Sequence, residues 1–80
     1  MSRRILFVDD EQAILSGLRR SLRSMRNEWE MTFAQSGVAA IAHLLDSDFD
    51  VIVTDMRLRG MDGVELLTRV KEDEPQIVRI

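Results

Sequence analysis

The sequence has 80 residues, of which 45% are hydrophobic and 31% charged, a size and composition typical of one small folded domain. The absence of cysteine excludes disulfides and thiolate zinc sites, and the formal net charge of −3 gives no general attraction to nucleic acid. The sequence lacks a signal peptide and an apolar run of membrane-spanning length, so we expect a cytoplasmic domain that binds neither nucleic acid nor membranes directly.

The chain opens with an apolar run at residues 5–8, which predicts a strand and ends in Asp9 and Asp10. Apolar residues then recur at helical spacing, which predicts an amphipathic helix with this core face: Ala13, Ile14, Leu18, Leu22 and Met25. Positive charge suits the last turns of a helix, and four arginines crowd them: Arg19, Arg20, Arg23 and Arg26. Because no aromatic residue interleaves with these arginines, we interpret them as a solvated helix end rather than a nucleic-acid patch.

Residues 29–33 alternate between apolar and polar, which predicts a strand with one buried face at the edge of a sheet. Ser36 can cap a second helix, whose predicted core face is Val38, Ile41, Ala42, Leu44 and Leu45. His43, the single histidine, lacks a second ligand or a paired nucleophile and is interpreted as a surface residue. Phe49 is expected to seal the core.

Residues 51–54 are all β-branched and lack polar alternation, which predicts a strand that helices cover on both faces. Asp55 follows directly. Asp62 and Glu65 predict the capped start of a third helix, which Pro75 ends and whose predicted buried stripe is Val64, Leu67 and Val70. Residues 77–80 predict a fourth strand. The order β-α-β-α-β-α-β predicts an α/β domain with parallel strands and right-handed crossovers.

Acidic residues follow two of the predicted strands, Asp9 and Asp10 after the first and Asp55 after the third. Open α/β sheets bind ligands at the carboxyl ends of their strands, and neighbouring strands lie about 5 Å apart. Carboxylates that meet there repel each other unless a cation binds, and an all-oxygen site with few carboxylates favours Mg²⁺ over Ca²⁺. Mg²⁺ in turn predicts a phosphate ligand, and an aspartate in such a site can become an aspartyl phosphate.

The alternative is that these acids only cap helices, which Asp10 could do for the first helix and Asp62 for the third. Asp55 does not fit this interpretation, because the next predicted helix begins several residues later. We therefore favour a functional site.

Three motifs together resemble the receiver domain of two-component response regulators: Phe7-Val8-Asp9-Asp10-Glu11, Asp55-Met56-Arg57-Leu58 and Gly60-Met61-Asp62-Gly63. The resemblance covers all 80 residues and implies a flavodoxin-like parallel sheet of order 2-1-3-4 with helices on both faces. It implies that Asp55 is the phosphoacceptor and that Asp9, Asp10 and Asp55 bind Mg²⁺ with the backbone carbonyl of Arg57. The implied phosphodonor is a histidine kinase or a phosphohistidine carrier protein. The domain would promote transfer to its own aspartate without being a turnover enzyme.

The sequence departs from the family pattern in two ways. Arg59 stands where the family usually has proline, which should loosen the loop without removing a ligand. The family's switch hydroxyl, its later lysine, its fifth strand and its last two helices are not among these residues. We therefore expect residues 1–80 to be the N-terminal portion of a receiver, with any output domain in a longer parent chain. The fourth strand would be a bare edge, which predicts a homodimer or domain swap of the isolated fragment.

Three functions stay open. A phosphorylation-controlled signalling domain is the favoured one, and a receiver-derived module that docks or dimerises without phosphorylation is the alternative. An Mg²⁺-dependent phosphohydrolase fits less well, because that class commonly has a second aspartate where this chain has Arg57. Residues 14–20 and 29–31 also resemble receivers that are fused to HDOD or HD-GYP output domains.

Overall fold

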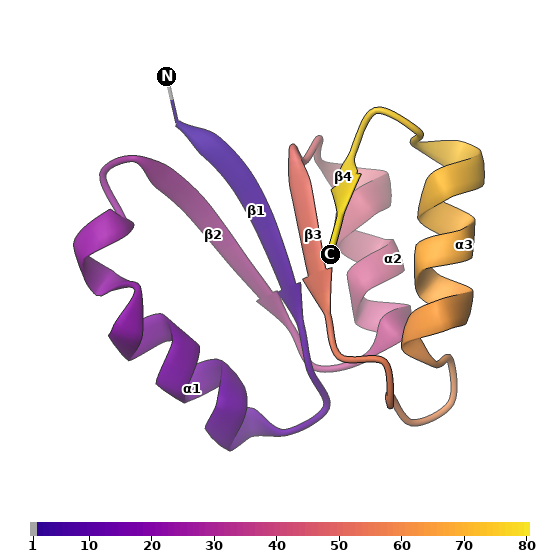
Figure 1. Ribbon diagram of the computed structural model, residues 1–80, viewed down its shortest axis with the longest axis horizontal. Coiled ribbons are helices and arrows are strands. Elements are labelled where there is room, and N and C mark those ends of the chain that lie inside the picture. The colour runs from indigo at the N-terminus through magenta and orange to yellow at the C-terminus, as the bar shows by residue number, and fades with distance from the viewer. Residues whose placement is uncertain (1) are drawn as a thin grey trace.

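A computed structural model describes residues 2–80, which form one parallel sheet with helices packed against it (Figure 1). The strands are β1 (Arg3–Val8), β2 (Trp29–Ala34), β3 (Val51–Thr54) and β4 (Val78–Arg79), and they pair in the order β2-β1-β3-β4. They alternate with α1 (Gln12–Ser21), α2 (Gly37–Asp46) and α3 (Gly63–Asp73), and a short 3₁₀ helix η1 (Arg23–Met25) follows α1. The predicted α/β class, parallel pairing and strand order are confirmed. Within residues 2–80, no helix combines the length and apolar character needed to cross a membrane.

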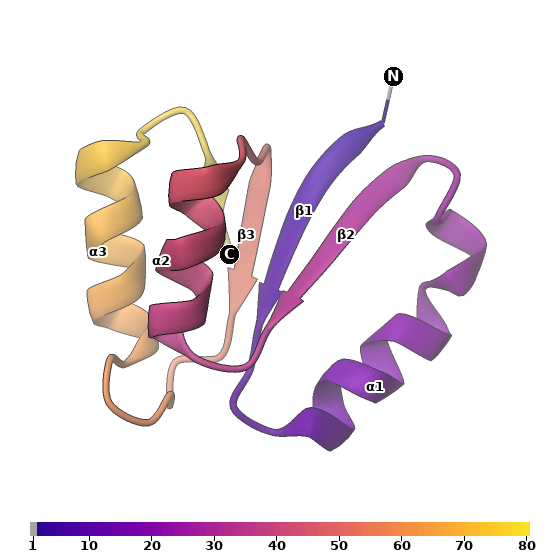
Figure 2. The same cartoon turned by 180° about the vertical axis from the view of Figure 1, so that it is seen from behind.

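The apolar run of β1 is buried on both faces because its side chains alternate between two cores. Ile5 and Phe7 pack with Leu15 of α1, whereas Leu6 and Val8 belong to the core beneath α2 and α3. In Figure 1, α2 lies behind the sheet with α3 beside it, and in Figure 2 α2 lies in front of the sheet. The predicted arrangement with helices on both faces is therefore confirmed.

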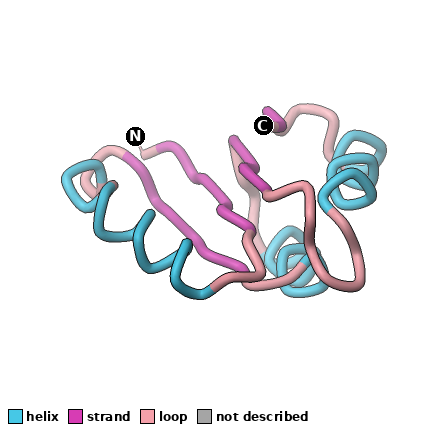
Figure 3. The backbone as a smooth tube through the Cα atoms, turned by 60° about the horizontal axis from the view of Figure 1, so that its bottom comes forward, coloured by secondary structure: helices cyan, strands magenta, loops and turns pink. Residues whose placement is uncertain are grey.

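β3 is less buried than its apolar sequence predicts. Ile52 is completely buried under α2 and α3, but Val51 and Val53 on the opposite face are only half-buried. The reason lies in the position of α1, which runs beside the β1 and β2 half of the sheet, while α2 and α3 lie towards β3 and β4 (Figure 3). Phe49, just before β3, is 6% exposed and seals the core as predicted.

Two helices begin with the side-chain caps that the sequence predicts. The Ala39 amide donates to the Ser36 hydroxyl oxygen (3.0 Å) at the start of α2. The Glu65 amide donates to Asp62 Oδ1 (2.8 Å) at the start of α3, while the Glu65 carboxylate turns towards Arg69, 3.9 Å away. Both caps fix where the chain leaves a loop and enters a helix.

The core face predicted for α2 is partly wrong. Val38 is 70% exposed and Leu45 is 85% exposed, and Ala42 is also on the outside. The buried positions are instead Gly37 and Ala40, with larger apolar side chains packed around them. Small residues are buried there because α2 approaches its neighbours closely: a Cβ at Gly37 would lie 2.9 Å from that of Met61, and Ala40 is completely buried.

The stripes predicted for α1 and α3 also need correction. On α1, Ile14 is 47% exposed and Leu15 is the buried residue; the helix ends at Ser21, so Met25 lies in η1. On α3, Val64 is 56% exposed and Leu66 is completely buried, whereas Val70 is buried as predicted.

Candidate metal centre

The sheet brings Asp9 and Asp55 to the same edge. Val8 pairs with Thr54 in the register of β1 and β3, so the next residue of each strand is an aspartate at the same level. The ladder continues one step beyond the strands: the Asp55 amide donates to the Val8 carbonyl (3.0 Å), and the Asp9 amide donates to the Ala34 carbonyl (3.1 Å). The backbones of both aspartates are therefore fixed by hydrogen bonds to neighbouring strands.

A backbone amide two residues further along the chain orients each of these two carboxylates. The Glu11 amide donates to Asp9 Oδ1 (2.9 Å), and the Arg57 amide donates to Asp55 Oδ1 (3.3 Å). This is the local turn that aspartate side chains commonly form with their own backbone. In each case the second carboxylate oxygen accepts no hydrogen bond from residues 2–80.

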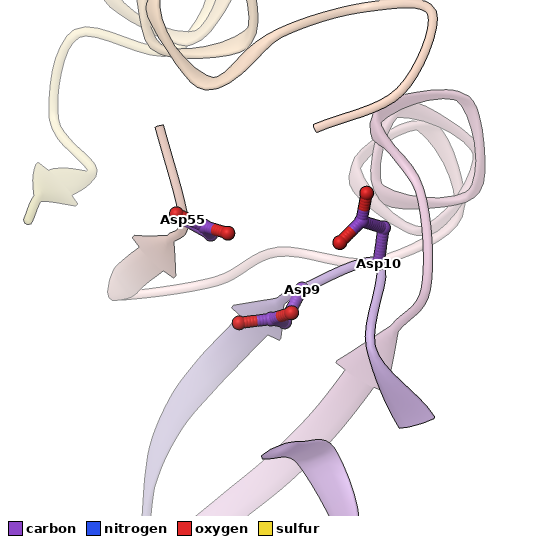
Figure 4. Close-up of side chains that lie close together, drawn as sticks. All are labelled: Asp9, Asp10 and Asp55. Carbon is purple, nitrogen blue, oxygen red and sulfur yellow. The ribbon is translucent and has the colours of Figure 1, made fainter. Parts of the chain in front are cut away.

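Asp10 completes the cluster. Figure 4 shows the side chains of Asp9, Asp10 and Asp55 directed into one space at the carboxyl ends of the strands. Each offers an oxygen, and these oxygens all lie within 4.8 Å of one another. Asp9 and Asp10 are half-buried and Asp55 is exposed, so the site is open to solvent on the Asp55 side. The predicted convergence of the three acids is confirmed.

The interpretation of Asp10 as a helix cap is wrong. Glu11 occupies the N-cap position of α1, and no side chain caps that helix end with a hydrogen bond. The Asp10 carboxylate is instead paired with Arg59, whose Nε lies 3.6 Å from Asp10 Oδ2. Asp62, in contrast, caps α3 and lies outside the cluster.

The donor set fits Mg²⁺, which prefers carboxylate, carbonyl and water oxygens. Mg²⁺ holds its ligands at about 2.1 Å, so two oxygens on opposite sides of one ion lie roughly 4.2 Å apart. The separations here, up to 4.8 Å, exceed that span by little, and rotation of the exposed Asp55 side chain or a bridging water would close the gap. The cluster has no histidine or thiolate that would favour a softer metal.

Gly63 is a residue of this site that the sequence does not single out. It opens α3, and a Cβ atom at this position would lie 2.6 Å from the Met56 Cα and closer still to the Asp55 carbonyl oxygen. The Gly63 amide also donates to the Met56 carbonyl (3.3 Å). Only glycine lets α3 pack this closely against the backbone that carries Asp55. The motif Gly60-Met61-Asp62-Gly63 contains the residue, but sequence does not reveal which backbone it contacts.

We expect Gly63→Ala to destabilise the domain by about 1 to 3 kcal/mol, because the added methyl group has to displace main chain rather than a flexible side chain. Gly17→Ala is the matched control. Nothing lies within 4 Å of a Cβ at Gly17 in α1, so alanine should stabilise the helix by roughly 0.5 to 1 kcal/mol. Urea denaturation of both variants measures the difference, and a Gly63→Ala variant as stable as the wild type would contradict the close approach.

The other groups considered from sequence lie away from the aspartates. Arg20, Arg23 and Arg26 line an open surface hollow of about 490 Å³ at the C-terminal end of α1 and along η1. Arg19 lies over the Phe33 ring, 4.6 Å from its centroid. His43 is half-buried on α2, so it is less exposed than predicted. None of these residues belongs to the acidic cluster.

The sequence profile described as "Response regulator receiver domain" matches residues 5–80. The chain belongs to this family. Among curated receiver-containing proteins, the response regulator VraR of Staphylococcus aureus is 35% identical over 77 residues, which cover 96% of this chain and 37% of VraR. The chain thus spans well under half the length of that relative.

Solved structures of receivers share the same fold. The signal receiver domain of an HD domain-containing protein from Pseudomonas fluorescens Pf-5 has a TM-score of 0.93 at 28% identity, covering 99% of this chain and 62% of that one. The response regulator TrrA from Thermotoga maritima, solved in complex with Mg²⁺ and BeF, has a TM-score of 0.86 at 25% identity, covering 96% of this chain and 65% of that one. These likenesses establish the flavodoxin-like receiver fold of the chain.

Proposed function

We propose that this receiver is a phosphoacceptor signalling domain that accepts a phosphoryl group on Asp55 from a histidine kinase, or from a phosphohistidine carrier protein, in an Mg²⁺-dependent reaction. The observation that carries the proposal is the convergence of Asp9, Asp10 and Asp55 within 4.8 Å at the carboxyl ends of neighbouring strands. Membership of the receiver family supports it. The output domain, the kinase and the cytoplasmic location belong to the whole protein and are proposed with it.

The metal would be held by the carboxylates of Asp9, Asp10 and Asp55 and by the backbone carbonyl of Arg57. When bound, Mg²⁺ supplies positive charge that offsets the repulsion between the carboxylates and the incoming phosphoryl oxygens. The TrrA structure in complex with Mg²⁺ and BeF supports this ligand class for a related receiver. Asp9 would be held in place by its bond from the Glu11 amide throughout.

Asp55 would act as the nucleophile. Its Oδ1 accepts a hydrogen bond from the Arg57 amide, so Oδ2 is the oxygen available for attack. That oxygen would form a bond to phosphorus as the bond between phosphorus and the donor imidazole nitrogen breaks, and the electron pair of that bond stays with the imidazole. The exposure of Asp55 leaves room for the donor histidine.

The test is incubation of the purified chain with a small phosphodonor, acetyl phosphate, with Mg²⁺ or with excess EDTA. We expect a single phosphoryl mass increment with Mg²⁺ and little or none with EDTA. An increment that is equally large under both conditions would contradict the role of the metal. Turnover of a generic phosphomonoester would favour a phosphohydrolase, but Arg57 stands where that class commonly has its acid/base aspartate.

A second candidate is a docking or dimerisation module that works without phosphate. The observation that favours it is the exposure of apolar side chains at the edge strand β4, where Val78 is 57% exposed and Ile80, just after the strand, is 67% exposed. Exposed apolar strand edges pair with other chains. We expect the isolated 80-residue polypeptide to form dimers or domain-swapped species whose population rises with concentration. Light scattering that gives 9.2 kDa at every concentration would contradict this expectation.

The HD-type output suggested by the resemblance of residues 14–20 and 29–31 is also a proposal. The likeness to a receiver from an HD domain-containing protein supports it.

A further inference from the structure

Arg59 is a basic side chain at the aspartate cluster. Its Nε atom lies 3.6 Å from Asp10 Oδ2, and the Arg59 side chain is 92% exposed while that of Asp10 is 17% exposed. The remaining ion pairs within residues 2–80 join Arg4 to Glu30 and Arg69 to Glu65, both outside the cluster. Arg59 therefore supplies the guanidinium that pairs with one of the three proposed metal ligands.

A buried residue and a turn lie on either side of Arg59 in the loop that brings it beside Asp10. Leu58, which precedes it, is 6% exposed and packs in the core beneath α2 and α3. Gly60, which follows it, has a φ of +77°, a left-handed conformation that turns the chain and that other residues rarely adopt. Between the buried Leu58 and the turn at Gly60, the exposed Arg59 side chain lies beside Asp10.

We infer that Arg59 regulates the metal affinity of this site: its guanidinium competes with the divalent cation for the carboxylate of Asp10. This inference rests on the proposed function, because it requires that Mg²⁺ binds to Asp9, Asp10 and Asp55.

The competition follows from charge. Three carboxylates within 4.8 Å repel one another, and the guanidinium offsets part of that repulsion when no metal is bound. A divalent cation that takes an Asp10 oxygen removes the partner of Arg59 and places two further positive charges beside it. Arg59 must then swing away into solvent. Because its side chain is already 92% exposed, this movement meets no packing barrier, so the effect is one of affinity rather than of access.

The size of the effect should be modest. An exposed ion pair contributes little interaction free energy, so losing the pair between Arg59 and Asp10 should change the Mg²⁺ binding constant by only about two- to fivefold. Arg59→Gln removes the charge and keeps a polar side chain, so we expect its Mg²⁺ dissociation constant to be about two- to fivefold lower than that of the wild type at low ionic strength. Arg59→Lys keeps the charge and should stay near the wild type.

The experiment is a calorimetric titration with MgCl₂, without any phosphodonor, on the wild type, Arg59→Gln and Arg59→Lys. Arg20→Gln is the matched control, because it removes the same charge from an exposed position at the far end of α1 (Figure 1), and its affinity should equal that of the wild type. Repeating the titrations in about 0.5 M KCl should shrink the difference between Arg59→Gln and the wild type, since salt screens exposed charges.

Two failures can be told apart. If neither the wild type nor Arg59→Gln binds Mg²⁺, the proposed metal centre is wrong and the inference falls with it. If the wild type binds Mg²⁺ and Arg59→Gln binds with the same affinity or more weakly, the metal centre stands and the inference about Arg59 is overturned. An equal decrease of the Mg²⁺ dissociation constant in Arg59→Gln and Arg20→Gln would also overturn the inference, because the effect would then come from net charge alone.

Discussion

Asp55→Asn is expected to abolish the phosphoryl mass increment that the wild type gains from acetyl phosphate and Mg²⁺. An asparagine amide is neutral and a poor nucleophile, so the acceptor oxygen is lost. The variant should still fold, because Asp55 is exposed and the asparagine side-chain oxygen can still accept the hydrogen bond from the Arg57 amide. Intact mass spectrometry measures the increment, and circular dichroism confirms that the variant is folded.

A matched control uses an aspartate outside the cluster. Asp46, at the end of α2, is exposed and contributes no oxygen to the site, so Asp46→Asn should gain the same increment as the wild type. Phosphorylation of Asp55→Asn to the wild-type extent would place the acceptor on another residue and would refute the proposed role of Asp55.

Leu66→Ala is expected to have the largest effect on stability, a loss of about 2 to 5 kcal/mol in the free energy of unfolding. Leu66 is completely buried in the core between α3 and the sheet, and truncation leaves a cavity there. A domain of this size has only roughly 5 kcal/mol or a little more in total. A loss near the upper end of this range would leave the variant largely unfolded at room temperature, and a loss near the lower end would lower its urea midpoint. Urea denaturation followed by circular dichroism measures either result.

Val64→Ala is the matched variant on the same helix. Val64 is 56% exposed, so its truncation should change the free energy of unfolding by no more than about 0.5 kcal/mol. The spacing of apolar residues in the sequence instead predicts that Val64 is buried, which would make its truncation strongly destabilising. If Val64→Ala proved the more harmful of the two substitutions, α3 would be rotated about its axis relative to the structure described here.

Much of the architecture could be predicted because the strands carry strong local signals. The apolar run at residues 5–8 predicts a strand, and in the structure both faces of that strand are buried. The caps at Ser36 and Asp62 depend only on residues three positions apart and were predicted for the same reason. The aspartate cluster follows from register, since parallel neighbours that end together deliver their next residues to one edge.

The rotation of the helices could not be predicted because small residues set it. On α3 the close approach of Gly63 to the backbone of Asp55 turns Leu66 and Val70 towards the sheet. On α2 a Cβ at Gly37 would lie 2.9 Å from Met61, so that position also faces inwards. The buried face of a helix is predicted from the spacing of its large apolar side chains, and glycine does not enter that pattern. Both helices also contain enough apolar residues to suggest more than one buried face.

The two turns that orient Asp9 and Asp55 use backbone amides, so the orientation of these carboxylates does not depend on neighbouring side chains. Each carboxylate takes its direction from a main-chain amide two positions downstream, which every residue type except proline provides. The identities of Glu11 and Arg57 are therefore free to vary, as far as this orientation is concerned. Substitutions at these two positions can therefore change the charge beside the site, and with it the partners that the site admits, while both carboxylates keep their orientation.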